Sequence, residues 1–113
     1  MNFKHGDIFL VNCSPSVGHE FQNIRPAIII ESDTRLQKTA LITVIPLTSN
    51  LSNRTSDDIL IGKNVHNNLY RDSLVKVANV HSYDRLRFIK KIGIVDLEIL
   101  TKIKYYIRNH FNL

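Results

Sequence analysis

Short apolar runs separated by polar segments follow one another through the first part of the chain. Each run is four or five residues long and rich in β-branched side chains, which is typical of strands and too short for helices. The runs cover residues 8–11, 27–30, 41–45 and 58–61. The third continues past Pro46 to Thr48, and this proline marks an edge, a bulge or a strand end because it has no amide hydrogen to donate. The polar segments 14–18, 31–38 and 49–56 predict loops, the second with one helical turn.

The longest alternating segment, residues 73–82, predicts one continuous strand. Alternation places on one face Ser73, Val75, Val77, Asn79 and His81. Residues 82–86 predict a helical turn, and residues 88–95 predict a final strand.

The C-terminal segment changes to helical spacing. Asp96 is a suitable N-cap residue because its short side chain can accept a hydrogen bond from the first turn. One arc at 3.6 residues per turn is apolar and contains Ile99, Leu100, Ile103, Tyr106, Ile107 and Phe111. Lys102, Arg108 and Asn109 lie opposite, so the pattern predicts an amphipathic helix that docks by its apolar side.

About six short strands followed by one helix predict a mainly β (α+β) fold, a small barrel with an appended C-terminal helix. A chain of 113 residues is long enough for one core and too short for two, so residues 1–113 predict a single domain. No apolar run approaches the roughly 18 residues of a membrane span, and the N-terminus lacks a secretory pattern. Cys13 has no partner cysteine and lies near an apolar run, which favours a small buried side chain over a reactive thiol. We therefore expect a cytoplasmic protein that has no contact with a membrane.

The formal net charge of +5 favours a polyanionic partner, because lysine and arginine displace counterions from a phosphate backbone. Charge alone also fits basic proteins that bind no nucleic acid. No cysteine pair or His-Glu-x-x-His motif is present, and the four glycines are too scattered for a phosphate loop. Asp57 and Asp58 point to opposite faces of a strand, which favours a charged strand entry over a magnesium site. We expect no metal site and no cofactor, so any catalysis must use side chains alone.

Three segments carry a more specific pattern. Residues 18–27 read Gly-His-Glu-Phe-Gln-Asn-Ile-Arg-Pro-Ala, residues 45–49 read Ile-Pro-Leu-Thr-Ser, and an Asp-Ser-led segment from residue 72 ends in Asp84-Arg85-Leu86. Gly6-Asp7 opens the first strand and Ile92-Gly93 closes the last. Together, in this order and over nearly the whole chain, these pieces resemble the MazF/PemK toxin family.

The resemblance implies an SH3-like barrel of the CcdB/MazF type, a C-terminal helix and a two-fold homodimer. It also implies metal-independent, sequence-specific cleavage of single-stranded RNA, with messenger RNA as the substrate. A cognate antitoxin protein would neutralise the toxin, and DNA would be bound only through the toxin–antitoxin complex.

The same resemblance implies roles for individual residues. Arg25 and Thr48 fall on the catalytic arginine and threonine of the family, and His19 and Glu20 fall in the loop that closes over RNA. The substrate-binding residues would be Gly18, Phe21, Gln22, Ser49, Asn79 and His81.

The chemistry agrees with these residue types. Without a metal, the 2′-hydroxyl attacks the adjacent phosphorus and leaves a 2′,3′-cyclic phosphate and a 5′-hydroxyl. The reaction needs a base, an acid and a fixed cation for the growing charge. An arginine can present a planar fork to two phosphate oxygens. Ordinary alternatives remain open: Arg25 in a surface ion pair, Thr48 as a turn cap, His19 and Glu20 as solvated side chains, and Phe21 as a hydrophobic anchor rather than a stacking ring.

One segment departs from the family. Where relatives commonly show Gln-(Ile/Val)-Arg, this chain has Asn79-Val80-His81, which lacks the fixed charge. The sequence therefore leaves open what supplies a second basic group and which RNA sequence is read. We expect His81 to line the RNA groove, either in place of a cation or as a base; the alternative is a neutral, half-buried strand histidine.

Two other functions fit parts of the pattern. A gyrase-poisoning toxin shares the barrel but acts by binding a protein. A non-catalytic SH3-like module would bind nucleic acid with a steep salt dependence and leave it intact.

Overall fold

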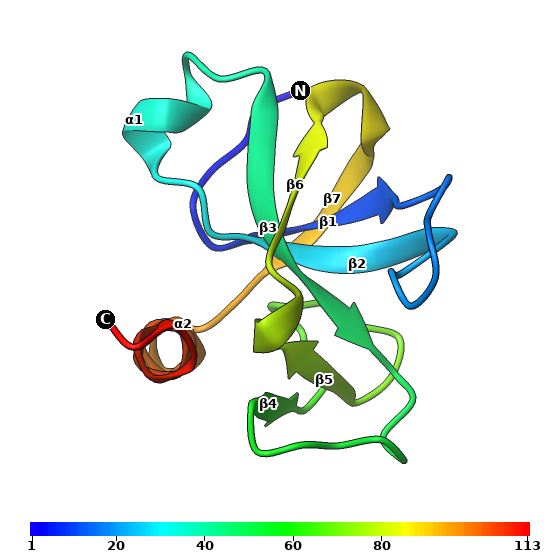
Figure 1. Cartoon of the computed structure of the whole chain (residues 1–113). Coiled ribbons are helices and arrows are strands. Elements are labelled where there is room, and N and C mark those ends of the chain that lie inside the picture. The colour runs from blue at the N-terminus through cyan, green and yellow to red at the C-terminus, as the bar shows by residue number, and fades with distance from the viewer.

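Seven antiparallel strands and a C-terminal helix make up most of the computed structural model, which describes residues 1–113 (Figure 1). The strands are β1 (Asp7–Asn12), β2 (Ile24–Ile29), β3 (Leu41–Thr48), β4 (Asp58–Ile61), β5 (Ser73–Lys76), β6 (His81–Asp84) and β7 (Phe88–Ile94). The helices are α1 (Asp33–Leu36) and α2 (Leu97–Phe111), with two 3-10 turns, η1 (Val77–Asn79) and η2 (Arg85–Arg87). The prediction of a mainly β fold with a terminal helix is confirmed.

Strand β3 organises the sheet because it pairs with three other strands. The order is β4-β5-β3-β2-β1-β7, and β6 pairs with β3 beside this path. The first half of β3 pairs with β6, in the register Val44↔His81, and its end pairs with β5, in the register Thr48↔Leu74. The bend between these halves gives the sheet its barrel-like curvature (Figure 1).

The apolar runs are continuous rather than alternating because both faces of the central strands are buried. Ile8, Ile28 and Ile45 belong to one core cluster, which also contains Leu100 and Ile103 of α2. Phe9, Val11, Ala27, Ile29 and Val44 belong to a second cluster on the other face. Neighbouring residues of one strand thus belong to different core clusters. Full burial of a valine, isoleucine or phenylalanine side chain stabilises the folded state by about 1.5–3 kcal/mol.

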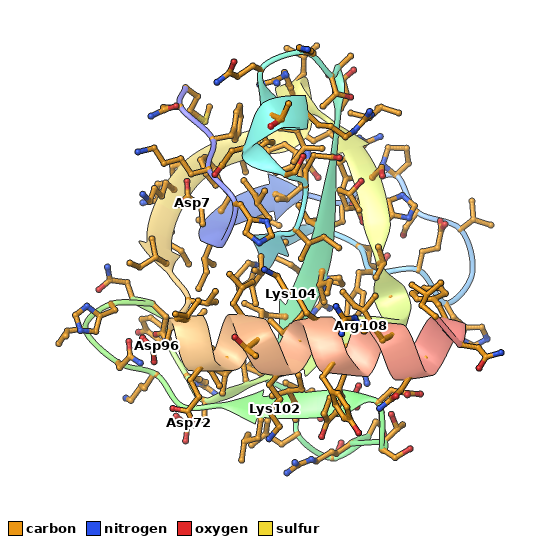
Figure 2. The ribbon with its side chains drawn as sticks, turned by 90° about the vertical axis from the view of Figure 1, so that its left-hand side faces the viewer. Asp7, Asp72, Asp96, Lys102, Lys104 and Arg108 are labelled. Atoms are coloured by element: carbon orange, nitrogen blue, oxygen red, sulfur yellow. The ribbon has the colours of Figure 1, made fainter.

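Helix α2 packs against one side of the molecule and lies in front in the view of Figure 2; its core residues share one cluster with residues of β4 and β5 and of the strands β1 to β3. The predicted apolar arc packs as expected through Leu100, Ile103 and their neighbours, but Phe111 is half exposed. Asp96 occupies the N-cap position, and its side chain makes no capping hydrogen bond there. No helix of the chain has the length and apolar character needed to cross a membrane.

The prediction of one strand over residues 73–82 is wrong. The chain leaves the sheet after Lys76, makes the 3-10 turn η1, and returns as β6 at His81. Val77 and Val80 both pack against the cluster that contains α2. Their spacing of three residues matches a 3-10 helix, with three residues per turn, better than a strand with period two. Consequently Asn79 and His81 do not share a strand face, and the following helical turn lies at 85–87 rather than 82–86.

Candidate active site

The loop between β1 and β2 is tied down at its base and at its tip. At the base, the Cys13 amide donates to the Asn23 carbonyl over 2.8 Å, and the Arg87 guanidinium donates to the Ser14 carbonyl. At the tip, Gly18 has φ +58°, a conformation that glycine adopts at little cost. The Glu20 carboxylate accepts from the Val17 amide at 2.7 Å, so one of its oxygens is already used to close the turn.

Arg25 follows this loop on β2 and has no acidic partner within ion-pair distance. Its Nε donates to the Gln22 carbonyl over 3.2 Å, and its guanidinium lies over the Phe21 ring. The two terminal nitrogens donate to no protein group, which leaves the bidentate edge of the guanidinium free. The structure thus rules out the surface ion pair as the role of Arg25.

Thr48 ends β3 and is half-buried. Its Oγ1 accepts a hydrogen bond from the Asn50 amide at 3.2 Å, so the hydroxyl does cap the turn, as one alternative had it. The hydroxyl hydrogen is not used by this contact and remains free to donate to another acceptor. The cap therefore fixes the oxygen and leaves its proton available.

Arg25 and Thr48 lie in the walls of one open cavity of about 410 Å³. The lining residues are Phe21, Arg25, Thr48, Ser49, Asn50, Asn53 and Lys76. The wall carries two cations and several hydroxyl and amide groups, and no carboxylate. Such a set of donors can stabilise an anion with distributed charge, which is the need of a phosphate group.

A second cavity, of about 270 Å³, adjoins the first because Phe21 lines both. His81 and Glu20 lie in its wall, and the His81 ring is 4.4 Å from the ring of Tyr83, measured between centroids. Burial, together with a hydrogen bond to the Cys13 thiol, raises the pKa of Tyr83 above its ordinary value. A tyrosine is protonated at neutral pH even without this shift, so the ring that contacts His81, at an interplanar angle of 45°, is uncharged.

The other predicted residues lie outside this pair of cavities. His19 and Gly18 are exposed at the loop tip and line neither cavity. Gln22 lines a third cavity, of about 390 Å³, together with Arg25 and Ser49. Asn79 is exposed on η1, and lines none of the three. The first cavity thus brings together four of the predicted residues: Phe21, Arg25, Thr48 and Ser49. Glu20 and His81 line the second cavity, and Asn79 lines neither.

Sequence reasoning missed Lys76, Asn50 and Asn53 as cavity residues. The alternating pattern places Lys76 on a long strand, and the two asparagines lie in a segment for which the sequence predicts only a loop. No group of three or more His, Cys, Asp or Glu side chains gathers at any point of the structure in a way suited to holding a metal ion.

The fold and the first cavity together describe a small antiparallel β protein with a cavity between its loops whose donors suit an anion. Residues 4–111 match the family described as PemK-like, MazF-like toxin of type II toxin-antitoxin system, and the chain belongs to this family. The resemblance seen in the sequence is thereby confirmed.

Individual relatives agree with this assignment. The chain is 28% identical over 116 residues to endoribonuclease MazF9 of Mycobacterium tuberculosis, covering 97% of each chain. Among solved structures, MazF of Deinococcus radiodurans superposes with a TM-score of 0.84 at 19% identity, covering 97% of this chain and 96% of that one. A mycobacterial endoribonuclease in complex with its cognate antitoxin superposes with a TM-score of 0.78 at 16% identity, covering 99% and 97%. These two likenesses concern the fold.

Proposed function

We propose that this protein is an endoribonuclease toxin that cleaves single-stranded RNA without a metal ion, and that its active site is the cavity of Arg25 and Thr48. One observation carries the proposal: the guanidinium of Arg25 has no acidic partner and shares a carboxylate-free cavity with the free hydroxyl hydrogen of Thr48. The family membership and the name of the tuberculosis relative support the same activity.

In the proposed mechanism the RNA phosphate occupies this cavity. The 2′-hydroxyl oxygen attacks the phosphorus, its proton passes to a base, and the bond from phosphorus to the 5′-oxygen breaks as that oxygen takes up a proton. The products are a 2′,3′-cyclic phosphate and a 5′-hydroxyl. Arg25 and Thr48 donate to the non-bridging oxygens, whose charge grows in the transition state; fixed donors of this kind act without reorganisation.

Proton transfer falls to the adjoining cavity. Glu20 keeps one carboxylate oxygen free of the turn, and His81 lies in the same wall. Glu20 is our candidate for the base or the acid, and His81 would contact the RNA. Phe21 lies between the two cavities and offers a ring on which a base can stack. His19 and Gly18, at the exposed tip of the loop, would contact RNA when the loop closes over it.

We further propose that residues 1–113 form one toxin domain that acts as a homodimer and is neutralised by a cognate antitoxin. The family description, which places these toxins in toxin–antitoxin systems, supports the antitoxin as a partner. Binding to DNA would occur only through the complex with the antitoxin.

Incubation of the purified protein with a long single-stranded RNA tests the function, with Arg25→Ala as the comparison. The proposal expects discrete cuts by the wild type and none by the variant. Intact RNA that is nonetheless bound, with a steep salt dependence, would instead indicate a non-catalytic binding module. Intact, unbound RNA together with inhibition of gyrase would indicate a gyrase-poisoning toxin.

A further inference from the structure

Lys76 lines the same cavity as Arg25 and Thr48, although the sequence pattern had not placed it there. We propose that Lys76 is a second phosphate-binding residue, whose ammonium group is held at the cavity wall by the buried carboxylate of Asp58. This inference rests on the proposed function and answers the question that the missing basic residue at position 81 leaves open.

The strand register places the lysine beside the site. Thr48 on β3 pairs with Leu74 on β5, and Lys76 lies two residues further along β5. Side chains at such positions point to the same face of a sheet. The backbones of two residues in this diagonal relationship are roughly 7–8 Å apart. At this separation, Thr48 and Lys76 are better placed to contact two successive phosphates of the RNA than two oxygens of one phosphate.

Asp58 holds the lysine in place from the neighbouring strand. Asp58 and Lys76 are paired residues of β4 and β5, and Lys76 Nζ donates to Asp58 Oδ2 over 2.7 Å. The Asp58 side chain is only 1% exposed and that of Lys76 is 16% exposed. The same Oδ2 also accepts from the Thr55 amide at 2.8 Å, which fixes the carboxylate. A flexible lysine side chain loses rotamer entropy when a ligand fixes it, and here the fold has already fixed the side chain.

The ammonium group keeps donors free for a ligand. Of its three N–H groups one goes to Asp58, and the others have no protein partner. Asp58 itself does not line the cavity, so the phosphate would meet the ammonium without meeting the carboxylate. The arrangement therefore presents a fixed cation at the end of the cavity and keeps its counter-charge buried behind it.

A double substitution tests this proposal without changing the net charge. Lys76→Met alone would leave Asp58 as an unpaired buried charge and could prevent folding. The variant Asp58→Asn/Lys76→Met removes both charges, and Asp7→Asn/Lys91→Met is its matched control. Asp7 and Lys91 form the other lysine pair with a buried aspartate, with Nζ 3.2 Å from Oδ1, and neither residue lines the Arg25 cavity.

The first readout is the affinity for an RNA with 2′-deoxyribose at the cut site, measured against salt concentration. We expect Asp58→Asn/Lys76→Met to lower the salt slope by about 0.7, the value for one phosphate contact on a single strand. We expect the control pair to keep the wild-type slope. On cleavable RNA the same variant should raise KM several-fold and change kcat by less than about threefold, since a flanking contact contributes uniform binding. The single variant Lys76→Arg, which keeps the positive charge beside Asp58, should keep the wild-type salt slope and the wild-type KM.

A wild-type slope and KM in Asp58→Asn/Lys76→Met, with only the melting temperature lowered, would overturn the proposal and leave the pair a structural link between β4 and β5. This outcome is distinct from failure of the proposed function, because the deoxy-substituted RNA reports the contact whether or not the protein cleaves. Failure of the proposed function would show as wild-type cleavage by Arg25→Ala, or as no cleavage at all.

Discussion

The guanidinium carbon of Arg25 lies 4.7 Å from the centroid of the Phe21 ring. Phe21 belongs to the loop between β1 and β2, and Arg25 belongs to β2, so this contact joins the loop to the strand. The ring covers one face of the guanidinium and leaves its edge toward the cavity, where hydrogen-bond donors are needed. The loop thereby orients the cation without placing an acid next to it.

The first prediction concerns Arg25 and Thr48. Arg25→Ala and Thr48→Ala should each lower the rate of RNA cleavage by about a hundredfold or more, the effect of losing one donor to a developing anion. Neither side chain belongs to a core cluster, so the melting temperatures should stay close to that of the wild type. Arg108→Ala and Thr101→Ala on α2 (Figure 2 labels Arg108) are matched controls and should cleave normally. Cleavage within about threefold of wild type in both site variants would place the active site elsewhere.

The second prediction concerns Phe21. Phe21→Ala should weaken cleavage about two- to thirtyfold, because a cation over a ring is stabilised by about 0.5–2 kcal/mol. Phe21→Tyr keeps the ring and should remain close to the wild type. Steady-state kinetics on a short RNA measures both variants. A Phe21→Leu variant as active as the wild type would show that the residue anchors the loop by its apolar surface alone.

The third prediction concerns His81, which the structure places in the adjoining cavity and not beside Asn79. We expect His81→Gln to change the set of RNA sequences that are cut and to raise KM, with kcat at a good site changing by less than about threefold. Asn79→Ala, on the exposed turn η1, should change neither. Sequencing of the cleavage ends compares the two variants directly. A loss of kcat in His81→Gln as large as in Arg25→Ala would instead make His81 the base or the acid.

The different outcomes for β3 and for residues 73–82 show what the sequence pattern can resolve. The bounds of β3 and β4 follow from β-branched runs, which fit only strands at that length. Residues 73–82 satisfy an alternating pattern over most of their length, but Val77 and Val80 also fit a spacing of three. Only the position of α2, which covers both valines, decides between the two, and that is a tertiary contact.

Lys76 was missed for a related reason. Its importance depends on Asp58, which lies 18 residues earlier and meets it only through the register of β4 and β5. The sequence pattern predicts a charged strand entry at Asp58, yet its side chain is buried. By contrast, Arg25 and Thr48 were found because each lies in a short local motif whose spacing needs no knowledge of the fold.

The fourth prediction concerns stability and pH through Glu31. Burial alone would raise the pKa of this carboxyl, but hydrogen bonds from Thr43 and Arg35 outweigh it and lower the pKa from its ordinary value of 4.5. The stabilisation is therefore present above about pH 4.5 and is lost as the pH falls through the lower folded-state pKa. Glu31→Gln should cost about 1 kcal/mol at neutral pH, or roughly 4 °C in melting temperature.

Thermal unfolding of the wild type and of Glu31→Gln across the acid range measures this effect. The difference between their melting temperatures should shrink as the pH falls below 4.5, since the wild-type carboxyl then becomes protonated as well. Glu98→Gln, an exposed carboxyl in the first turn of α2, is the control. If the difference in melting temperature between Glu31→Gln and the wild type stays constant with pH, the ionised carboxylate of Glu31 is not the source of the stabilisation.

The most direct test of the whole account is the chemistry of the RNA ends. Purified protein is incubated in excess EDTA with two RNAs of the same sequence, one of which carries 2′-deoxyribose at the mapped cut site. If Arg25 and Thr48 stabilise attack by the 2′-hydroxyl, the all-ribose RNA will be cut to 2′,3′-cyclic phosphate and 5′-hydroxyl ends, and the deoxy-substituted RNA will stay intact at that site. Two results would contradict this mechanism: cleavage that is lost in EDTA and returns when magnesium is added, or cleavage of the deoxy-substituted RNA at the mapped site.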